Sequence, residues 1–144
     1  MGTETAVPVR TDNDISGAAL AEDLLQGVGN EQMRAATRLL GAHRNGYWLR
    51  RFIGDQELAA ATADHPLIDR DARRPSVDWD AVGLVLLDKP WILKASSSEK
   101  AVLEIAASLL NRCGVQLGRV LRAVDGREFR LILDALAEAG HSPA

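Results

Sequence analysis

The stretch SSSEKAVLEIAASLLNRCG, residues 96–114, carries the most complete helix signal in the chain. Ser96 followed three residues later by Glu99 forms a capping box, in which each side chain bonds the backbone N–H of the other residue and begins a helix. Gly114 suits the left-handed position that follows a helix end. The apolar face between these signals consists of Val102, Ile105, Ala106 and Leu109. The spacing therefore predicts a helix over 97–111 that packs by one face.

Two further amphipathic helices are expected after this stretch, over 116–124 and 126–139. Asp125 is placed to cap the second of them, and Gly140 to end it. Their apolar faces, expected in the core, are Leu117, Val120, Leu121 and Val124 for the first and Phe129, Ile132, Leu133 and Leu136 for the second. Three helices in this order follow the plan of a trihelical helix-turn-helix unit. The segment LILDALAEAG resembles the closing helix of winged-helix regulators, although the sequence that follows leaves no room for a wing.

On the N-terminal side, helices are expected over 17–26, over 30–40, and from residue 44 or 47 to 53. A brief helix after Asp55 should end at His65-Pro66, because the residue before a proline disfavours the helical region. The segment 76–90 fits two structures. Ser76 is placed to cap a helix, whereas the run GLVLL also suits a buried strand. Helix is favoured because no second strand is evident, and residues 81–87 are left open between the two.

The composition agrees with an all-α fold. The chain has 144 residues, 47% of them hydrophobic and only 4% aromatic, so its core must be built mainly from aliphatic side chains. We expect a small orthogonal helical bundle of six or seven short helices. Residues 1–14 are expected to be a flexible tail, 15–65 an N-terminal helical part, 66–75 a loop or linker, and 76–140 a C-terminal helical unit. The two helical parts are expected to share one core, since a chain of this length usually forms one domain.

The sequence also bounds the location. It contains one cysteine, Cys113, so an intrachain disulfide is impossible and a reducing compartment suits the chain. The first fifteen residues lack the apolar segment of a signal peptide, and no apolar run approaches the 18 residues of a membrane span. A cytoplasmic protein without membrane contact is therefore expected.

Basic residues gather in two zones of a chain whose net charge is −3. The first contains the stretch HRNGYWLRRF, residues 43–52, and its candidate nucleic-acid or anion contacts are Arg34, Arg38, Arg44, Tyr47, Arg50 and Arg51. The second lies in the C-terminal unit and offers Arg119, Arg122, Arg127 and Arg130. Guanidinium groups beside aromatic rings suit phosphate and single-stranded nucleic acid. The alternative is that Trp48 and Phe52 face the core while the arginines lay their stems along its edge. Helical spacing favours the alternative, because both rings fall on one face with Leu49.

A third candidate region is the apolar segment VGLVLLDKPWIL, residues 82–93, which lies between Trp79 and Trp91. Tryptophan is a favoured anchor at protein interfaces, so Trp79 and Trp91 are the candidate partner contacts. The alternative is that this segment forms the central core element of one domain.

Signals for catalysis are weak. The three histidines are far apart in sequence and form no metal-type pair, and no glycine-rich phosphate-binding loop is present. We therefore expect no catalytic residue, no metal and no cofactor. The leading hypothesis is a non-catalytic protein-protein interaction or adaptor protein that acts through helix faces, and its candidate partners are an unknown protein or a second copy of itself in a homodimer. The alternative is a small nucleic-acid-binding regulator with a helix-turn-helix-like C-terminal unit.

Overall fold

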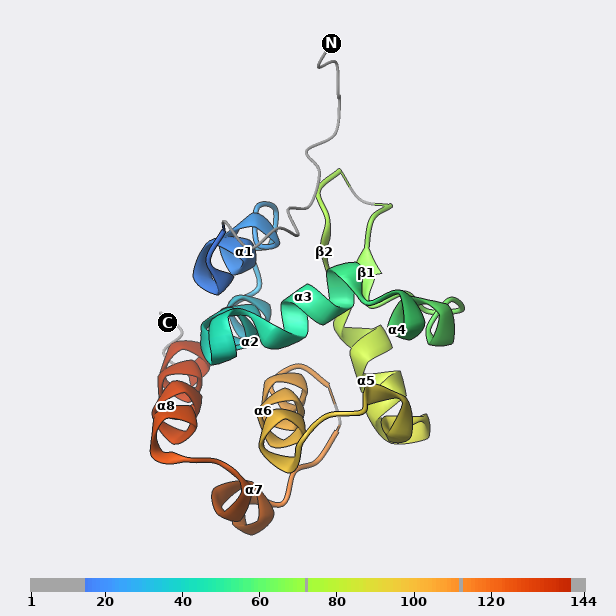
Figure 1. Cartoon of the computed structure of the whole chain (residues 1–144). Coiled ribbons are helices and arrows are strands. Elements are labelled where there is room, and N and C mark those ends of the chain that lie inside the picture. The colour runs from blue at the N-terminus through green and yellow to red at the C-terminus, as the bar shows by residue number, and fades with distance from the viewer. Residues whose placement is uncertain (1–14, 72, 112, 141–144) are drawn as a thin grey trace.

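The computed structural model describes residues 15–71, 73–111 and 113–140, so the expected tail over 1–14 lies outside the described residues. Within them the chain is all-α apart from one very short antiparallel sheet (Figure 1). The α-helices are α1 (Gly17–Asp23), α2 (Glu31–Ala42), α3 (Tyr47–Gly54), α4 (Gln56–Ala61), α5 (Trp79–Asp88), α6 (Ser97–Ser108), α7 (Leu117–Ala123) and α8 (Gly126–Gly140). Two 3₁₀ turns, η1 (His43–Asn45) and η2 (Pro90–Leu93), and the strands β1 (Ile68–Asp69) and β2 (Ser76–Val77) complete the described elements. The predicted all-α class is confirmed, but the described residues form eight α-helices instead of the six or seven expected.

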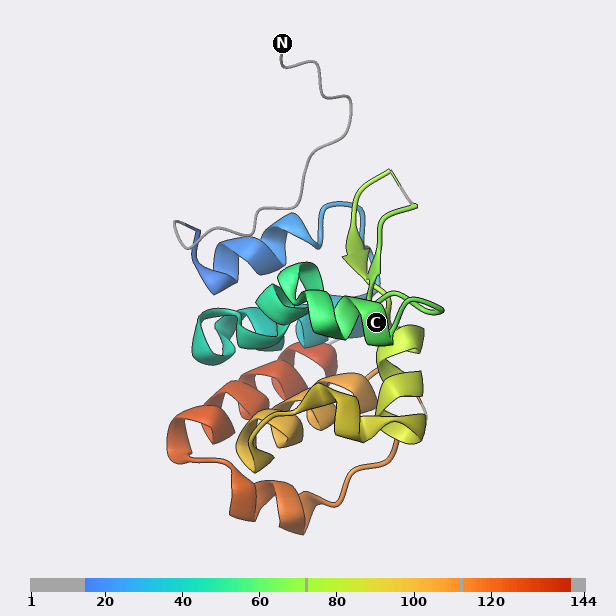
Figure 2. The same ribbon diagram turned by 45° about the vertical axis from the view of Figure 1, so that its right-hand side comes forward.

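Helix α6, which the capping box predicts, is the centre of the molecule. It contacts α2, α5, α7 and α8, which surround it in Figures 1 and 2. Six of its twelve residues are buried: Ala101, Val102, Leu103, Ile105, Ala106 and Ala107. Ser96 and Glu99 form the capping box as expected, and the backbone oxygen of Glu99 accepts a hydrogen bond of 2.8 Å from the indole of Trp48. One buried cluster draws residues from both the 15–65 and the 76–140 parts around this helix.

The alternative for the first basic zone holds in one respect. Trp48 and Phe52 of α3 are buried, as helical spacing predicted, and their rings lie 6.0 Å apart in a tilted arrangement. Burial of two large aromatic side chains stabilises the fold by several kcal/mol in total, at about 2–3 kcal/mol each. The rings are therefore core anchors.

Helix α1 approaches α2 more closely than any side chain would allow. A Cβ atom added to Gly17 would lie 2.2 Å from the backbone oxygen of Gly41, so only glycine fits there. The chain after α2 turns through three consecutive left-handed residues, Arg44, Asn45 and Gly46, with φ angles of 47°, 55° and 82°. The Asn45 side chain accepts a hydrogen bond of 2.8 Å from the backbone N–H of Gly17, which ties this turn to the start of α1. The sequence predicted an end of this helix at residue 40, but Gly41 lies inside α2, where an added Cβ atom would lie 2.7 Å from the backbone oxygen of Gly17.

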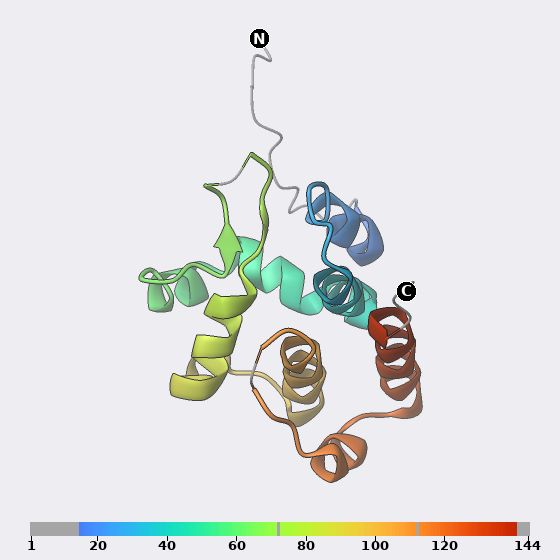
Figure 3. The same ribbon diagram turned by 180° about the vertical axis from the view of Figure 1, so that it is seen from behind.

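The segment predicted as a loop over 66–75 forms most of a hairpin that projects from the helical body (Figures 1 and 3). Ile68 pairs with Val77 and Asp69 with Ser76. Ser76 is therefore in a strand, and the cap of α5 is Asp78, whose side chain accepts from the N–H of Ala81 at 3.0 Å. The open question over 81–87 resolves as helix, because α5 covers this stretch. No helix in the described part of the chain has the length and apolar character needed to cross a bilayer.

Candidate interaction surfaces

The first basic zone is occupied by intramolecular bonds. Arg34 donates to the backbone oxygens of Val28 at 2.7 Å and Leu25 at 3.4 Å, and so holds the turn between α1 and α2. Arg38 bridges Glu22 of α1 at 2.8 Å and Glu138 of α8 at 2.5 Å. The hydrogen bond from Arg38 is the main reason why the pKa of Glu22 lies below its usual value, and the two carboxylates raise the pKa of Arg38. Both arginines connect elements of the fold.

The remaining members of this zone are engaged in the same way. Arg50 donates to the backbone oxygens of Asn45 and Ile15, each at 2.7 Å. Arg51 pairs with Asp55 at 3.0 Å, donates to the backbone oxygen of Leu93, and stacks 5.2 Å from the ring of Trp48. Tyr47 is half-buried, with its ring edge-on to that of Trp48 and beneath the same guanidinium. A polyanion would have to displace these bonds before it could use the zone.

Arg44 belongs to a buried network that sequence reasoning missed. Its guanidinium donates to Glu99 at 2.6 Å and lies 3.4 Å from a carboxylate oxygen of Glu128. The same oxygen lies 2.8 Å from Nε2 of His43, and the side chains of His43 and Glu128 are only 1% and 5% exposed. Asp125 and Glu128 also form a reciprocal cap at the start of α8, with bonds of 2.8 and 2.9 Å. The spacing Asp-x-x-Glu before an apolar helix was the available signal for this cap.

The ring of His43 is enclosed by this network. A hollow of about 430 Å³ lies beside it, lined among others by His43, Arg127 and Leu131. Nε2 of His43 is engaged by Glu128, and Nδ1 is buried and has no hydrogen-bond partner among the described residues. Cys113 is also buried, its sulfur is 3.7 Å from the backbone oxygen of Gly83, and burial raises the pKa of its thiol. A thiol in that setting is a poor nucleophile. Among the described residues, no group of three or more histidine, cysteine, aspartate or glutamate side chains could hold a metal ion.

The second basic zone divides into one engaged and three free arginines. Arg119 of α7 pairs with Glu104 of α6. Arg122, Arg127 and Arg130 are exposed and have no ion pair or hydrogen bond within the described ranges. Of the ten residues predicted to contact nucleic acid or anions, these three leave their charged groups available.

The two tryptophans proposed as partner contacts have opposite positions. Trp79 is 3% exposed and packs in the core, so its ring cannot contact a partner in this fold. Trp91 on η2 is 67% exposed. Leu84 and Leu87 of α5, a helix that contacts η2, are 41% and 67% exposed, and we call these two residues and Trp91 the Trp91 surface. A hollow of about 220 Å³ between α4 and α5 borders this surface at Leu84.

A second apolar surface lies on the last two helices. Five side chains that the sequence assigned to the core are exposed, namely Leu117 (60%), Leu121 (53%), Phe129 (38%), Leu133 (41%) and Leu136 (42%). Helix α7 lies below α6, and a short connection joins it to the start of α8, which runs alongside α6 and α2 (Figures 1–3). We call these five residues the α7–α8 surface. Only Val120 and Ile132 of the two predicted core faces are fully buried, because α6 and α2 cover one side of each helix.

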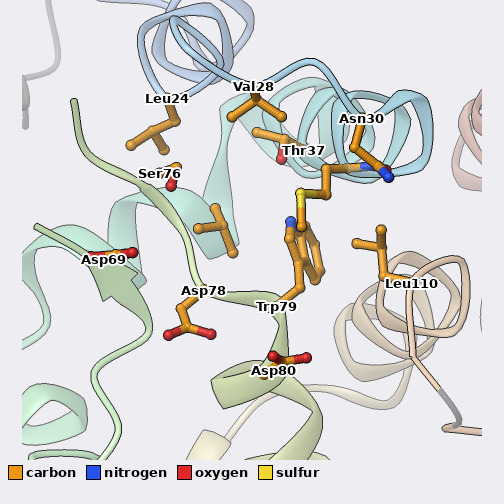
Figure 4. A pocket seen from close by; sticks show the side chains of 12 residues that line it. Leu24, Val28, Asn30, Thr37, Asp69, Ser76, Asp78, Trp79, Asp80 and Leu110 are labelled. Carbon is orange, nitrogen blue, oxygen red and sulfur yellow. The ribbon is translucent and has the colours of Figure 1, made fainter. Parts of the chain in front are cut away.

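A polar hollow of about 390 Å³ lies between the α1–α2 turn, the hairpin and the start of α5 (Figure 4). Each of its three carboxylates has a role in the fold itself. Asp78 caps α5, and Asp69 accepts from the backbone N–H of Asp71 at 3.0 Å. Asp80 is exposed in the first turn of the same helix, where a negative charge favours the helix dipole. The hollow is therefore a consequence of how the hairpin meets α5.

In comparisons with known proteins, no family model, curated protein or solved structure matches this chain. The described residues form a small all-α protein in which two groups of large apolar side chains, the Trp91 surface and the α7–α8 surface, are exposed.

Proposed function

We propose that this chain is a non-catalytic protein-protein interaction or adaptor protein, and that its partner binds at the Trp91 surface. One observation carries the proposal. Trp91 is 67% exposed, whereas the other two tryptophans, Trp48 and Trp79, are 0% and 3% exposed. Tryptophan is strongly enriched among the residues that dominate binding energy at interfaces. An exposed tryptophan beside an equally exposed leucine, Leu87, is therefore expected to have a partner.

The neighbourhood of Trp91 supports the same proposal. The hollow beside Leu84 could receive a side chain of the partner, and its rim carries the charged residues Asp88 and Lys89. An apolar centre with a charged rim is the usual anatomy of a specific interface. The proposed setting is the cytoplasm, because a single buried cysteine suits a reducing compartment.

The experiment compares three tagged chains as bait: the wild type, Trp91→Ala, and the control Met33→Ala. Met33 is a suitable control because it is also a large exposed apolar residue, but it lies on α2, outside both apolar surfaces. We expect a protein that the wild type and the control retain and that Trp91→Ala loses, followed by direct binding of that purified protein with at least tenfold weaker affinity for Trp91→Ala. Equal capture of every protein by all three chains would refute the proposal.

The second candidate function, a small nucleic-acid-binding regulator, rests on the free guanidinium groups of Arg122, Arg127 and Arg130. It is the weaker of the two, because the exposed part of α8 also carries the apolar residues Phe129 and Leu133 and the carboxylate of Asp134 beside Arg130. Base reading in the major groove needs hydrogen-bonding side chains. Labelled DNA and RNA should be titrated at about 50 mM salt, where phosphate contacts are strong. Absence of binding there would rule this candidate out, whereas binding that Arg122→Glu/Arg127→Glu/Arg130→Glu abolishes would favour it.

A further inference from the structure

Helix α8 carries an apolar stripe that the fold leaves uncovered. Phe129, Leu133 and Leu136 fall at i, i+4 and i+7, so they lie along one side of the helix. The buried residues Ile132 and Ala135 lie on the adjacent side, which packs on the body of the molecule. A stripe of this spacing beside a core face is typical of a helix that packs against a second helix.

The two opposite charges beside this stripe are complementary to the same two charges on a second copy of the helix. Arg130 and Asp134 are exposed, four residues apart, on the flank of the stripe that faces away from the core, and neither has an ion pair within the described ranges. In an antiparallel helix pair related by a two-fold axis, equal flanks of the two helices face each other. If the axis passes between Ile132 and Leu133, Phe129 of each copy meets Leu136 of the second copy. The same axis places Arg130 of each copy within one residue, about 1.5 Å along the helix, of Asp134 of the second copy, which is close enough for an ion pair.

The available apolar area is sufficient for such a pair. With a full accessible area of about 200 Å² for a large apolar side chain, the exposed fractions of the five α7–α8 residues amount to roughly 450 Å² per copy. Homodimer interfaces are about 65% apolar, so two copies would bury roughly 1,400 Å² in total, within the standard range of specific interfaces.

From these observations we propose that the α7–α8 surface is the interface of a homodimer, in which α8 pairs antiparallel with α8 of a second copy. The proposal names the occupant of one surface within the interaction function proposed above, and leaves the Trp91 surface of each copy to the partner protein. An acidic helix of another protein would fit the apolar stripe but would have no use for Asp134. A second copy uses both charges.

The first test measures mass by analytical ultracentrifugation of the full-length chain. We expect the wild type to have twice the mass of the 15.5 kDa chain at micromolar concentration. Leu133→Glu should be monomeric, because it places a carboxylate in the centre of the stripe, whereas the control Leu87→Glu on the Trp91 surface should remain dimeric. A wild type that stays monomeric up to about 0.5 mM, far above the range expected for an interface of this area, would overturn the proposal.

The second test distinguishes the antiparallel α8–α8 dimer from a dimer with any other interface. It changes only the exposed charged residues Arg130 and Asp134, so the apolar stripe stays intact in every variant. Arg130→Glu and Asp134→Arg should each weaken dimerisation at least tenfold, because each brings like charges together across the axis. The double variant Arg130→Glu/Asp134→Arg should return to within about threefold of the wild type, since it restores both pairs in reverse. Failure of the double variant to recover would overturn the antiparallel pairing. The bait experiment with Trp91→Ala is independent of all these results, so it can succeed or fail by itself.

Discussion

Replacing Glu128 with alanine is expected to reduce the free energy of unfolding by about 3–5 kcal/mol, the usual effect of removing one partner from a buried polar pair. Glu128 accepts from His43 through one carboxylate oxygen and from the backbone N–H of Asp125 through the other. Alanine removes both acceptors. His43, which is 1% exposed and already lacks a partner at Nδ1, would then have neither ring nitrogen bonded. The unbonded ring costs about 1–3 kcal/mol and the lost helix cap about 1 kcal/mol, to which the vacated volume adds.

The assay is urea unfolding at pH 7, followed by circular dichroism, with thermal unfolding as a second readout. For a chain of this size the expected loss corresponds to a Tm lower by roughly 10–15 °C. The matched control is Glu128→Gln, expected to lose only about 1 kcal/mol. Its amide oxygen can accept from Asp125 while its amide N–H donates to His43 in the other tautomer. If Glu128→Ala lost less than about 1 kcal/mol, or no more than Glu128→Gln, the buried pair would not be holding α8 in place.

Three further outcomes follow from single contacts. Gly17→Ala should lower the free energy of unfolding by about 2 kcal/mol or more, because its Cβ would lie 2.2 Å from the backbone of α2. The control is Gly27→Ala, whose Cβ would have no atom within 4 Å. Equal free energies of unfolding for the two variants would contradict the close packing of α1 on α2. Burial acts to raise the pKa of Glu99, but hydrogen bonds from a serine and an arginine outweigh it and lower the pKa from 4.5. The ionised Glu99 therefore contributes fully to stability above pH 4.5, and this contribution is lost as the pH falls through the lowered pKa. Glu99→Gln should flatten the dependence of the unfolding free energy on pH, measured from about pH 6 to 2. An unchanged slope in that range would refute the stabilising role of the Glu99 carboxylate. Trp91→Phe should remove most of the acrylamide-quenchable tryptophan fluorescence, and a wild type with no such component would show that Trp91 is covered in solution.

The parts of the fold that sequence reasoning predicted correctly depend on neighbours along the chain. The capping box at Ser96, the inward position of Trp48 and the all-α class all follow from spacings of three or four residues. The hairpin was missed because its two strands have only two residues each, and a strand of that length has no readable alternation. The cap of α5 was assigned to Ser76 instead of Asp78 for the same reason, since the strand pairing moves the helix start.

Of the candidate sites, the sequence identified Trp91 but not its exposure relative to Trp79, because both lie in similar apolar surroundings. It identified the arginines but not their partners. Arg38, for example, bonds Glu138, which is 100 residues away in sequence. The pairing of His43 with Glu128 spans 85 residues and had no local signal on the histidine side.

The sequence by itself determined which segments form most of the helices and, at Ser96, where one of them begins, because capping bonds and apolar periodicity act within one or two turns. Only the tertiary structure decided which apolar stripes are covered and which charges are paired. Ile132 and Leu133 are adjacent and equally apolar, yet one is buried and the other is 41% exposed, because burial depends on where α2 and α6 lie relative to α8. Helix periodicity fixes the angle between two side chains, and the packing of distant segments fixes which of them meets water.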